Sequence, residues 1–199
     1  MNRSIAILGC GGHGKVVGEI ALLNKFKTIH FFDDAFKDKK KFDFLIKGNF
    51  ADMVKKKKNY SSFFIAIGNN KIRSEKLKYL EKYKFNIINL IHPTSVVSKL
   101  AFTEKGICFM ANSVINPGSR IGFGSIINTS SSIDHDCIIG KFCHIAPNAS
   151  LSGEVKIGDY SWIGTGASIK NNIKVGKYCV IGVGSKVYKN ISDKIIYKN

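Results

Sequence analysis

A six-residue periodicity of branched apolar residues spans residues 115–187 and constrains the fold more than any other feature. Every sixth residue of this stretch is Ile, Leu or Val, without a change of register. These positions are Ile115, Ile121, Ile127, Ile133, Ile139, Ile145, Leu151, Ile157, Ile163, Ile169, Val175, Ile181 and Val187. A period of six matches neither an amphipathic helix nor the alternation of an ordinary strand. It is typical of a parallel β-helix in which three hexapeptides form one triangular coil.

A second row of mostly small residues lies two positions before each apolar position. Its members are Ser113, Ser119, Ser125, Ser131, Cys137, Cys143, Ala149, Ser161, Ala167, Cys179 and Ser185. We expect the branched residues to fill the interior and the small residues to fit its crowded edges. Phe109, Val97 and Ile91 keep the register upstream, which gives about five coils stacked roughly 4.8 Å apart. The repeat alone is equally compatible with a scaffold that carries no chemistry.

Cysteine usage and hydropathy bear on the compartment. The 199 residues allow one or two domains, and the five cysteines have no CxxC spacing. Cys137, Cys143 and Cys179 belong to the small row, so we expect them to be core thiols in a reducing compartment. No apolar run is long enough for a membrane span, and the run at positions 5–8 is too short for a signal peptide. We expect a cytoplasmic protein without a membrane span.

The net charge of +17 indicates attraction to anions. Residues 1–90 carry 19 basic and 8 acidic residues, a net charge of +11. Nucleic acid is one candidate partner, but the lysine runs at 37–41 and 55–58 lack arginine and interleaved aromatic residues. A lysine-rich solvated surface explains them better, so we expect no nucleic-acid partner. The excess charge still favours phosphorylated small substrates.

A glycine-rich loop follows the first expected strand, residues 4–8. Residues 9–14 read Gly-Cys-Gly-Gly-His-Gly, and the pattern predicts a helix over residues 15–24. Glycines at 9, 11 and 14 match G-x-G-x-x-G between a strand and a helix, where backbone amides approach a phosphate. A second strand over residues 28–32 ends in Asp33 and Asp34, where such folds hold a ribose or a base edge.

The remaining elements complete a small α/β domain over residues 1–90. We expect a lysine-rich loop at 35–48, helices at 49–58 and 72–84, and strands at 62–67 and 86–90. The glycine motif alone would suggest NAD. Because the domain has about four strands instead of six, a mononucleotide or sugar nucleotide is the better prediction. Residues 91–199 form the β-helix domain, so the fold class is α/β plus β.

The residues most suited to catalysis lie at one predicted corner of the β-helix. His135 and Asp136 follow the apolar position Ile133, and both side chains can project outward where strand alternation fails. A histidine suits the removal of a proton from an attacking amine, and a nearby carboxylate would raise its basicity. Gly153 lies one coil further along the chain and is a candidate oxyanion donor. Asp134, His135 and Asp136 are consecutive, so we expect no metal site from them.

His144 lies nine residues, half a coil, from His135. The two side chains should therefore lie on opposite sides of one chain, and a site that uses both must be shared between subunits. Ile126, His144, Trp162 and Val180 recur once per coil and should stack on one outer face. Such an apolar stripe favours a subunit interface or a wall for acyl-CoA. A stripe that packs only against the first domain is the alternative.

A Gly-Gly-His-Gly α/β domain followed by a hexapeptide β-helix resembles the PglD/NeuD-type sugar acyltransferases over nearly the whole chain. The specific motifs are residues 11–14, Asp33-Asp34, His92-Pro93 and residues 128–136. The resemblance implies a Rossmann-like first domain that holds the nucleotide, a left-handed β-helix that holds CoA, and a homotrimer. It implies acetyl-CoA-dependent N-acetylation of a UDP-4-amino-4,6-dideoxy sugar or a similar nucleotide sugar, for a bacterial surface glycan or glycoprotein.

The same resemblance assigns residues in three groups. His135 matches the family's base and Asp136 the carboxylate beside it. The expected acetyl-CoA contacts are His144, Thr165 and Val183. The expected sugar-nucleotide contacts are Gly11, Gly12, His13, Asp33, Asp34 and Gly48. The chain lacks the Gly-Val-Pro-Ala-Lys-like tail of the relatives, so contacts beyond Val187 are not carried over.

Three other functions remain open at this point. One is O-acetylation of sialic acid or a related sugar, which uses the same fold and co-substrate. Another is a nucleotide-sugar-binding scaffold without catalysis, and a third is a dinucleotide-binding regulator. The sequence does not identify the nucleotide base or the sugar, and it does not separate N- from O-acylation.

Overall fold

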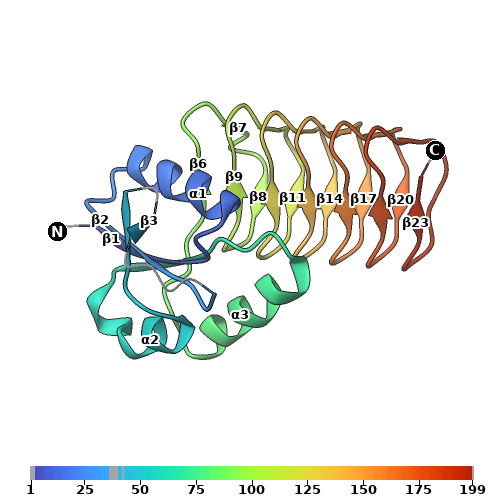
Figure 1. Ribbon diagram of the computed structural model, residues 1–199. Coiled ribbons are helices and arrows are strands. Elements are labelled where there is room, and N and C mark those ends of the chain that lie inside the picture. Colours follow the sequence, from blue (N-terminus) through green and yellow to red (C-terminus); the bar gives the residue numbers. More distant parts are fainter. Residues whose placement is uncertain (1–2, 36–39, 42, 199) are drawn as a thin grey trace. The chain divides into compact units, whose positions relative to one another are not determined.

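The computed structural model describes residues 3–35, 40–41 and 43–198, and the chain divides into two compact units, Met1–Leu90 and Ile91–Asn199. The first unit is an α/β domain, and the second is a stack of short parallel strands (Figure 1).

The first unit is built on one sheet with the strand order β3-β4-β2-β1-β5. Strands β1, β2, β4 and β5 pair in parallel, and only β3 runs antiparallel to its neighbour β4. The chain leaves β1 towards β2 on one side and later returns to β5 on the other. This reversal creates a switch point at the carboxyl end of β1, which is where open parallel sheets bind ligands. The strands are β1 (Ser4–Leu8), β2 (Thr28–Phe32), β3 (Lys40–Lys41), β4 (Phe44–Ile46) and β5 (Ser62–Ile65).

The helices lie on both faces of this sheet. They are α1 (Gly12–Leu23), α2 (Phe50–Lys55) with a following 3-10 turn (Lys57–Asn59), and α3 (Asn70–Lys82). Phe31 faces α1, since a side chain added at Gly14 or Gly18 would meet its ring. The next residue, Phe32, faces the other side and packs edge-on against Tyr60. Alternation along β2 thus gives α1 and α2 opposite faces of the sheet (Figure 1).

Three expectations for this unit are wrong in detail. The segment 35–48 contains the short strands β3 and β4 instead of a continuous loop, although residues 36–39 and 42 lie outside the described residues. The expected strand over 86–90 is reduced to one parallel bridge between Phe63 and Ile87. Its last residue instead begins β6, which pairs within the β-helix. Helices α1 and α3 also begin earlier than expected, at Gly12 and Asn70.

The second unit is a triangular parallel β-helix with three faces. Face 1 contains β6 (Leu90–Ile91), β9 (Cys108–Phe109), β12 (Ile126–Ile127), β15 (His144–Ile145), β18 (Trp162–Ile163), β21 (Val180–Ile181) and β23 (Ile196–Tyr197). Face 2 contains β7 (Val96–Val97), β10 (Val114–Ile115), β13 (Ser132–Ile133), β16 (Ser150–Leu151), β19 (Ser168–Ile169) and β22 (Lys186–Val187). Face 3 contains β8 (Phe102–Thr103), β11 (Arg120–Ile121), β14 (Ile138–Ile139), β17 (Lys156–Ile157) and β20 (Lys174–Val175).

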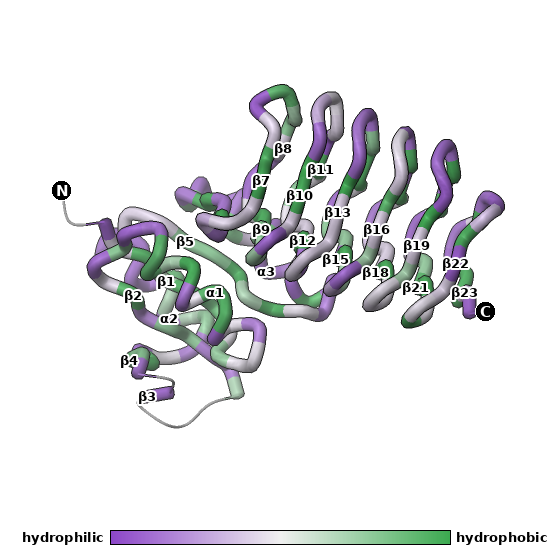
Figure 2. The backbone as a smooth tube through the Cα atoms, turned by 90° about the horizontal axis from the view of Figure 1, so that it is seen from above, coloured by the Kyte–Doolittle hydropathy of each residue, from purple (hydrophilic) through white to green (hydrophobic). Residues whose placement is uncertain are grey.

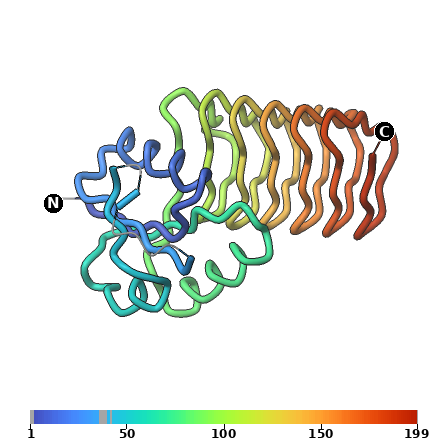
Figure 3. The backbone as a smooth tube through the Cα atoms, viewed as in Figure 1, coloured from blue at the N-terminus to red at the C-terminus, as the bar shows by residue number. Residues whose placement is uncertain are grey.

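Successive coils pair residues at a constant interval of three hexapeptides, as in Ile115 with Ile133 and Ile133 with Leu151. The coils lie side by side along the unit (Figure 3), and apolar segments recur from coil to coil (Figure 2). All branched residues of the six-residue repeat are buried and form one continuous core. The sequence prediction of a hexapeptide prism is therefore confirmed for the interior.

The small residues at the edges of the prism do more than fit a narrow space. The hydroxyl of Ser125 accepts a hydrogen bond from the Cys143 N–H at 3.0 Å and donates one to the Gly140 carbonyl at 2.9 Å. Ser161 makes the same pair of bonds with Cys179 N–H and the Gly176 carbonyl. These hydroxyls satisfy backbone groups that would otherwise be buried without partners, which is costly.

Each hexapeptide turns the chain through a residue in the left-handed backbone region. From residue 106 to residue 184 every sixth residue has φ between 55° and 76°. These residues are Gly106, Asn112, Gly118, Gly124, Ser130, Asp136, Phe142, Asn148, Glu154, Tyr160, Gly166, Asn172, Tyr178 and Gly184. For residues other than glycine this conformation costs about 1–3 kcal/mol and persists only where the surroundings enforce it. The stacked coils enforce it here, because both neighbouring coils fix each turn.

The last coil is shorter than the others, yet it keeps the interior filled. Val175 bridges to Ile191 and Ile181 pairs with Tyr197, so the interval between partners is slightly smaller here than in the preceding coils. Ile191 and Tyr197 pack with the core of the prism. The β-helix thus continues beyond Val187, where the repeat in the sequence ends.

In the described part of the chain, no helix has the length and apolar character needed to cross a membrane.

We predict that Ile157→Ala lowers the free energy of unfolding by about 2–5 kcal/mol, because it opens a cavity in the prism. Lys156→Ala is the matched control, since Lys156 is the outward neighbour on the same strand and should change stability by no more than about 0.5 kcal/mol. Denaturant unfolding at fixed protein concentration measures both. Equal effects of the two substitutions would contradict the inward orientation of Ile157.

Candidate functional site

The turn between β13 and β14 holds the residues predicted to act in catalysis. The Nδ1 atom of His135 lies 2.9 Å from Oδ2 of Asp136, and Asp134 Oδ1 accepts the His135 backbone N–H at 2.8 Å. Asn116, one coil earlier, donates to the same Asp134 oxygen at 2.8 Å. We call Asp134, His135 and Asp136 the catalytic corner. His135 and Asp136 remain more than half exposed, so substrate can reach the imidazole.

The left-handed backbone at Asp136 places its carboxylate beside the imidazole. Asp136 has φ of 58°, and its N–H bonds to the Pro117 carbonyl of the preceding coil at 3.1 Å. A side chain at Gly118 would collide with Asp136 Oδ1. Glycine at position 118 therefore leaves the space that the carboxylate occupies.

The electrostatics of the corner favour a basic histidine. The hydrogen bond that His135 donates to the Asp136 carboxylate raises the pKa of His135 above its usual range, and the charges of Asp134 and Glu154 act in the same direction. The hydrogen bond from Asn116 lowers the pKa of Asp134, so this carboxylate stays ionised. The arrangement therefore stabilises an imidazolium, the product of proton abstraction by His135.

Gly153 lies directly against the imidazole of His135. A Cβ atom at this position would come within 2.6 Å of Nε2 and Cε1 of His135. The structure thus brings together His135, Asp136 and Gly153, as their spacing indicates, and any larger residue at 153 would displace the ring. Glu154 follows on the same turn, and its N–H bonds to the His135 carbonyl at 3.0 Å.

A column of side chains on face 1 contains the second predicted histidine. Ile126, His144, Trp162 and Val180 pair in register on β12, β15, β18 and β21, as their regular spacing predicts. The rings of His144 and Trp162 lie 4.2 Å apart, and His144 Nε2 is 3.0 Å from Nδ2 of Asn128. His144 is buried, whereas Trp162 and Val180 are exposed. The column is therefore buried at Ile126 and His144 and continues as an exposed apolar wall at Trp162 and Val180.

Thr165 and Val183 lie at the corner between face 1 and face 2, one coil apart, and both are exposed. They border the open part of the column, beside Trp162 and Val180. The catalytic corner lies between face 2 and face 3, across the prism from face 1. Within one chain the structure therefore separates His135, Asp136 and Gly153 from His144, Thr165 and Val183.

The glycine loop lies at the switch point of the first unit, and its glycines divide into two kinds. A Cβ at Gly9 would meet the Ala66 carbonyl oxygen at 2.5 Å, and one at Gly14 would collide with the Gly9 carbonyl. Packing therefore requires glycine at positions 9 and 14. A Cβ at Gly11 or Gly12 would meet nothing within 4 Å. Gly11 is also the N-cap of α1 and gives no side-chain cap, which leaves the helix N-terminus open to an anion.

The predicted acidic residues line a cavity of about 300 Å³ at this switch point. Its walls come from the ends of three strands and from α3: Leu8, Gly9, Asp33, Asp34, Ala35, Ile67, Ile72 and Lys76. Asp33 accepts hydrogen bonds from the Cys10 N–H at 2.6 Å and the Ala35 N–H at 2.8 Å. Asp33 therefore fixes the glycine loop as well as lining the cavity.

Asp34 and Gly48 complete this region. Asp34 accepts from the Phe50 N–H at 2.8 Å and from Lys76 Nζ at 3.0 Å. Burial opposes ionisation of Asp34, but these two bonds outweigh it and lower its pKa. The Gly48 carbonyl accepts the Asp33 N–H at 2.9 Å, and Gly48 has φ of 134°. Asp33, Asp34 and Gly48 thus lie together, as the prediction of one nucleotide site requires.

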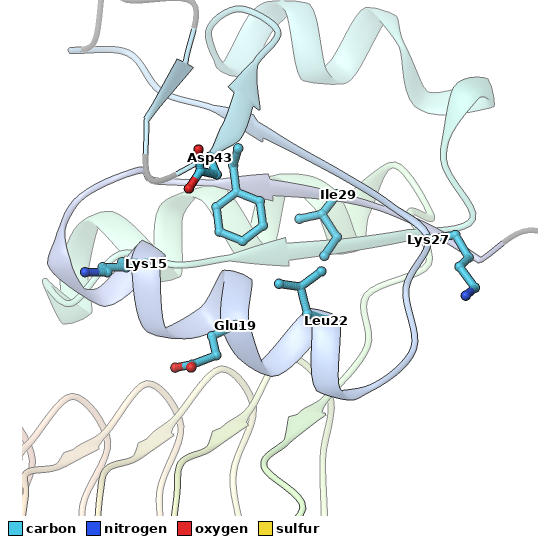
Figure 4. A pocket seen from close by; sticks show the side chains of 7 residues that line it. Lys15, Glu19, Leu22, Lys27, Ile29 and Asp43 are labelled. Carbon is cyan, nitrogen blue, oxygen red and sulfur yellow. The ribbon is translucent and has the colours of Figure 1, made fainter.

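One further cavity does not coincide with the predicted site residues. A larger cavity of about 520 Å³ lies between α1 and β4 (Figure 4), lined by Lys15, Glu19, Leu22, Lys27, Ile29, Asp43 and Phe44. In residues 3–35, 40–41 and 43–198 no three His, Cys, Asp or Glu side chains are arranged to hold a metal ion.

Comparisons with known proteins match both units. Residues 4–80 match the model of the PglD N-terminal domain, and residues 154–189 match the bacterial transferase hexapeptide (six repeats). UDP-N-acetylbacillosamine N-acetyltransferase of Bacillus subtilis (strain 168) is 34% identical over 120 residues, which is 55% of this chain. The alignment spans only about half, 52%, of that curated relative.

Solved structures match over nearly the full length. The acetyltransferase domain of PglB from Neisseria gonorrhoeae FA1090, in complex with acetyl coenzyme A, is 36% identical with a TM-score of 0.94, covering 98% of this chain and 95% of that one. PerB from Caulobacter crescentus, in complex with CoA and GDP-perosamine, is 31% identical with a TM-score of 0.90, covering 96% and 91%. The chain belongs to the PglD/NeuD-type sugar acyltransferase family.

Family membership confirms the predicted fold, a small Rossmann-like domain followed by a left-handed β-helix. The individual site residues stay predictions. Sequence reasoning did not assign Asn128, Glu154 or Lys76, which the structure brings against His144, His135 and Asp34. Glu154 is predictable from the sequence, because it lies one coil after Asp136 in the repeat. Lys76 and Asp34 are too far apart in sequence for any spacing rule to connect them.

We predict that Gly12→Val weakens UDP binding by roughly tenfold or more, since a branched side chain would block a charge-assisted hydrogen bond worth about 1.5–3 kcal/mol. The fold should be retained, because a Cβ added at Gly12 meets nothing within 4 Å in the described structure. Gly14→Ala is the contrasting variant and should lower the melting temperature. Calorimetric titration and thermal unfolding separate the two effects. Unchanged UDP affinity in Gly12→Val would exclude this loop as the phosphate site.

We predict that Asp136→Asn moves the acid limb of kcat/KM to lower pH. The Asp136 hydrogen bond raises the pKa of His135, so the base becomes active only as pH rises through that raised value. Without the bond the pKa falls and the limb shifts downward, while the plateau rate decreases because the base is weaker. NMR titration of the imidazole and the pH–rate profile measure both. Asp159→Asn, at a different corner, is the control, and an unmoved limb in Asp136→Asn would refute the coupling.

Proposed function

We propose that this chain is an acetyl-CoA-dependent N-acetyltransferase that acts on a nucleotide-activated amino sugar. The observation that carries the proposal is the catalytic corner, where a histidine of raised pKa is hydrogen-bonded to a carboxylate and lies against Gly153. The similarity to structures solved in complex with acetyl coenzyme A, or with CoA and GDP-perosamine, supports the same activity.

The reaction follows from these side chains. The amine nitrogen of the sugar attacks the thioester carbonyl carbon, and His135 takes the proton that the nitrogen loses. The C–S bond then breaks, the amide forms, and the CoA thiolate leaves and receives a proton, which the imidazolium can supply. Asp136 holds the imidazole and stabilises its charged form, and the Gly153 N–H is our candidate donor to the oxyanion. Removing the base should slow turnover by about 10²–10⁴-fold.

The substrates are assigned to separate surfaces. Gly11, Gly12, His13, Asp33, Asp34 and Gly48 are proposed to hold the sugar nucleotide at the switch point. His144, Thr165 and Val183, beside the apolar wall of Trp162 and Val180, are proposed to hold acetyl-CoA. All five cysteines are buried thiols in the described structure, which supports a cytoplasmic location, where acetyl-CoA and nucleotide sugars are made.

The direct test is mass spectrometry of purified chain mixed with acetyl-CoA and a panel of UDP-, GDP-, dTDP- and CMP-linked sugars. We expect one acetyl group on a nucleotide-linked 4-amino sugar and none on the 4-hydroxy analogue. His135→Ala should abolish the product while nucleotide binding persists. Acetylation of sialic acid alone would favour O-acetyl transfer. Nucleotide-sugar binding without acetylation of any sugar would favour a scaffold.

We further propose a homotrimer with one site at each subunit boundary. The catalytic corner and the His144 column lie on opposite sides of one prism, so both can serve one site only across two chains. The exposed wall of Trp162, Val180 and Ile196 is also costly on a monomer.

Light scattering tests this assembly. The chain mass is 22.0 kDa, so we expect a particle of about three times that mass. Trp162→Lys should weaken the assembly and lower activity together. Lys156→Ala, on an outward position of face 3, is the control. A fully active monomer would contradict the shared site.

A further inference from the structure

Arg73 is the largest fully buried side chain in the described part of the chain, with 1% of its surface exposed. It lies in the first turn of α3, just after the N-cap Asn69, whose side chain accepts from the backbone N–H groups of Lys71 and Ile72. A buried guanidinium is costly unless hydrogen bonds compensate for the loss of water. The burial of Arg73 therefore requires hydrogen-bond acceptors around its guanidinium group.

The guanidinium holds the loop that follows β5. Nη1 donates to the carbonyl oxygens of Ile67 at 2.9 Å and Gly68 at 2.8 Å, and Nη2 donates to Oδ1 of Asn70 at 2.7 Å. The planar fork of arginine matches this set of acceptors, whereas a lysine ammonium is a single point charge. Residues 67–70 are thereby fixed to one buried group.

This loop forms one wall of the proposed nucleotide cavity and also contacts the glycine loop at Gly9. Ile67 lines the cavity together with Gly9, Asp33 and Asp34. At Gly9 an added Cβ would meet the Ala66 carbonyl oxygen at 2.5 Å and Cγ1 of Ile67 at 3.1 Å. The glycine loop therefore rests against the segment that Arg73 holds. A shift of residues 66–68 would displace the amides expected to bind phosphate.

The charge of Arg73 also reaches the glycine loop. Burial, together with the charge of Arg73, lowers the pKa of His13 to about 4. Part of His13 reaches solvent, but its Nε2 atom is buried and has no hydrogen-bond partner among the described residues. His13 is thus neutral at neutral pH, whereas Arg73, whose charge acts on it, does not titrate.

We propose that Arg73 is a positioning residue of the nucleotide pocket, which fixes residues 67–70 against the glycine loop and supplies a permanent positive charge beneath the diphosphate. This inference rests on the proposed function, because it takes the glycine loop as the phosphate site. Arg73 does not touch the ligand. In a poorly solvated interior one charge acts over a longer distance than at the surface, so a buried cation contributes to binding of a dianion without contact.

A second cation, Lys76, lines the cavity itself. Lys76 is paired with Asp34 at 3.0 Å within the cavity wall. The two cations therefore have separate roles. Lys76 holds the acidic edge of the cavity in place, and Arg73 holds residues 67–70.

The test compares Arg73→Gln and Arg73→Lys with Lys71→Gln in the full chain. Lys71→Gln removes one charge from the same turn of α3, but at an exposed position. Calorimetry gives the Kd for UDP, steady-state kinetics give KM for acetyl-CoA, and NMR follows the titration of His13. Thermal unfolding reports whether each variant is folded.

Arg73→Gln should raise the Kd for UDP roughly tenfold or more, the effect of losing one buried charge near a dianion. It should raise the pKa of His13 above its value of about 4 while KM for acetyl-CoA stays unchanged. Arg73→Lys keeps the charge, so the pKa of His13 should stay low, with a smaller rise in Kd from the lost fork. Lys71→Gln should match the wild type in all three measurements.

Three results would overturn the proposal. One is a folded Arg73→Gln chain with wild-type affinity for UDP. Another is a folded Arg73→Lys chain with the same weakened affinity as Arg73→Gln and no difference in the His13 titration. The third is failure of both variants to fold, which would make Arg73 a purely structural residue. A wild-type chain that binds UDP without transferring acetyl groups would contradict the proposed function alone and leave this test intact.

Discussion

The stacking of hexapeptide coils in one constant register governs where every proposed catalytic side chain lies. Backbone hydrogen bonds join each coil to the next, as between the Asp134 N–H and the Leu151 carbonyl at 3.0 Å. The same register places Gly153 under the imidazole of His135 and Trp162 against the ring of His144. A slip of one residue would turn the interior isoleucines outward and separate these pairs. Core packing and site geometry therefore depend on the same constraint.

The interior of the β-helix could be predicted from the sequence because one residue type fills it. Branched apolar side chains at a fixed interval leave a signal that a single sequence reveals. The left-handed turn residues occur just as regularly but leave no such signal, because they include Asp136, Phe142 and Tyr160. Neighbouring coils impose that backbone conformation, so the residue type at these positions does not reveal it. The bridging role of Ser125 and Ser161 is not predictable for a similar reason, because a small residue indicates limited space but does not reveal its hydrogen bonds.

The candidate site was predictable where sequence spacing corresponds to spatial distance. His135 and Asp136 are neighbours, Gly153 lies one coil on, and the column from Ile126 to Val180 follows the same interval. In the first unit, Gly9, Gly11 and Gly14 marked the switch point, but their different roles required the structure. Arg73 left no signal at all, since a single arginine in a helix of lysines and glutamates resembles a surface residue. Its burial follows from the path of residues 67–70, which no periodicity encodes.

The central claim is that one active site combines the catalytic corner of one chain with the His144 column of another. Co-expression of His135→Ala chains with His144→Ala chains tests it most directly. Each variant alone should be inactive, and random mixing in a cyclic trimer should restore about a quarter of the wild-type sites, because that share of boundaries receives both intact histidines. We predict that the purified hetero-oligomer has activity near that level. A mixture as inactive as either variant alone would contradict a site shared between chains.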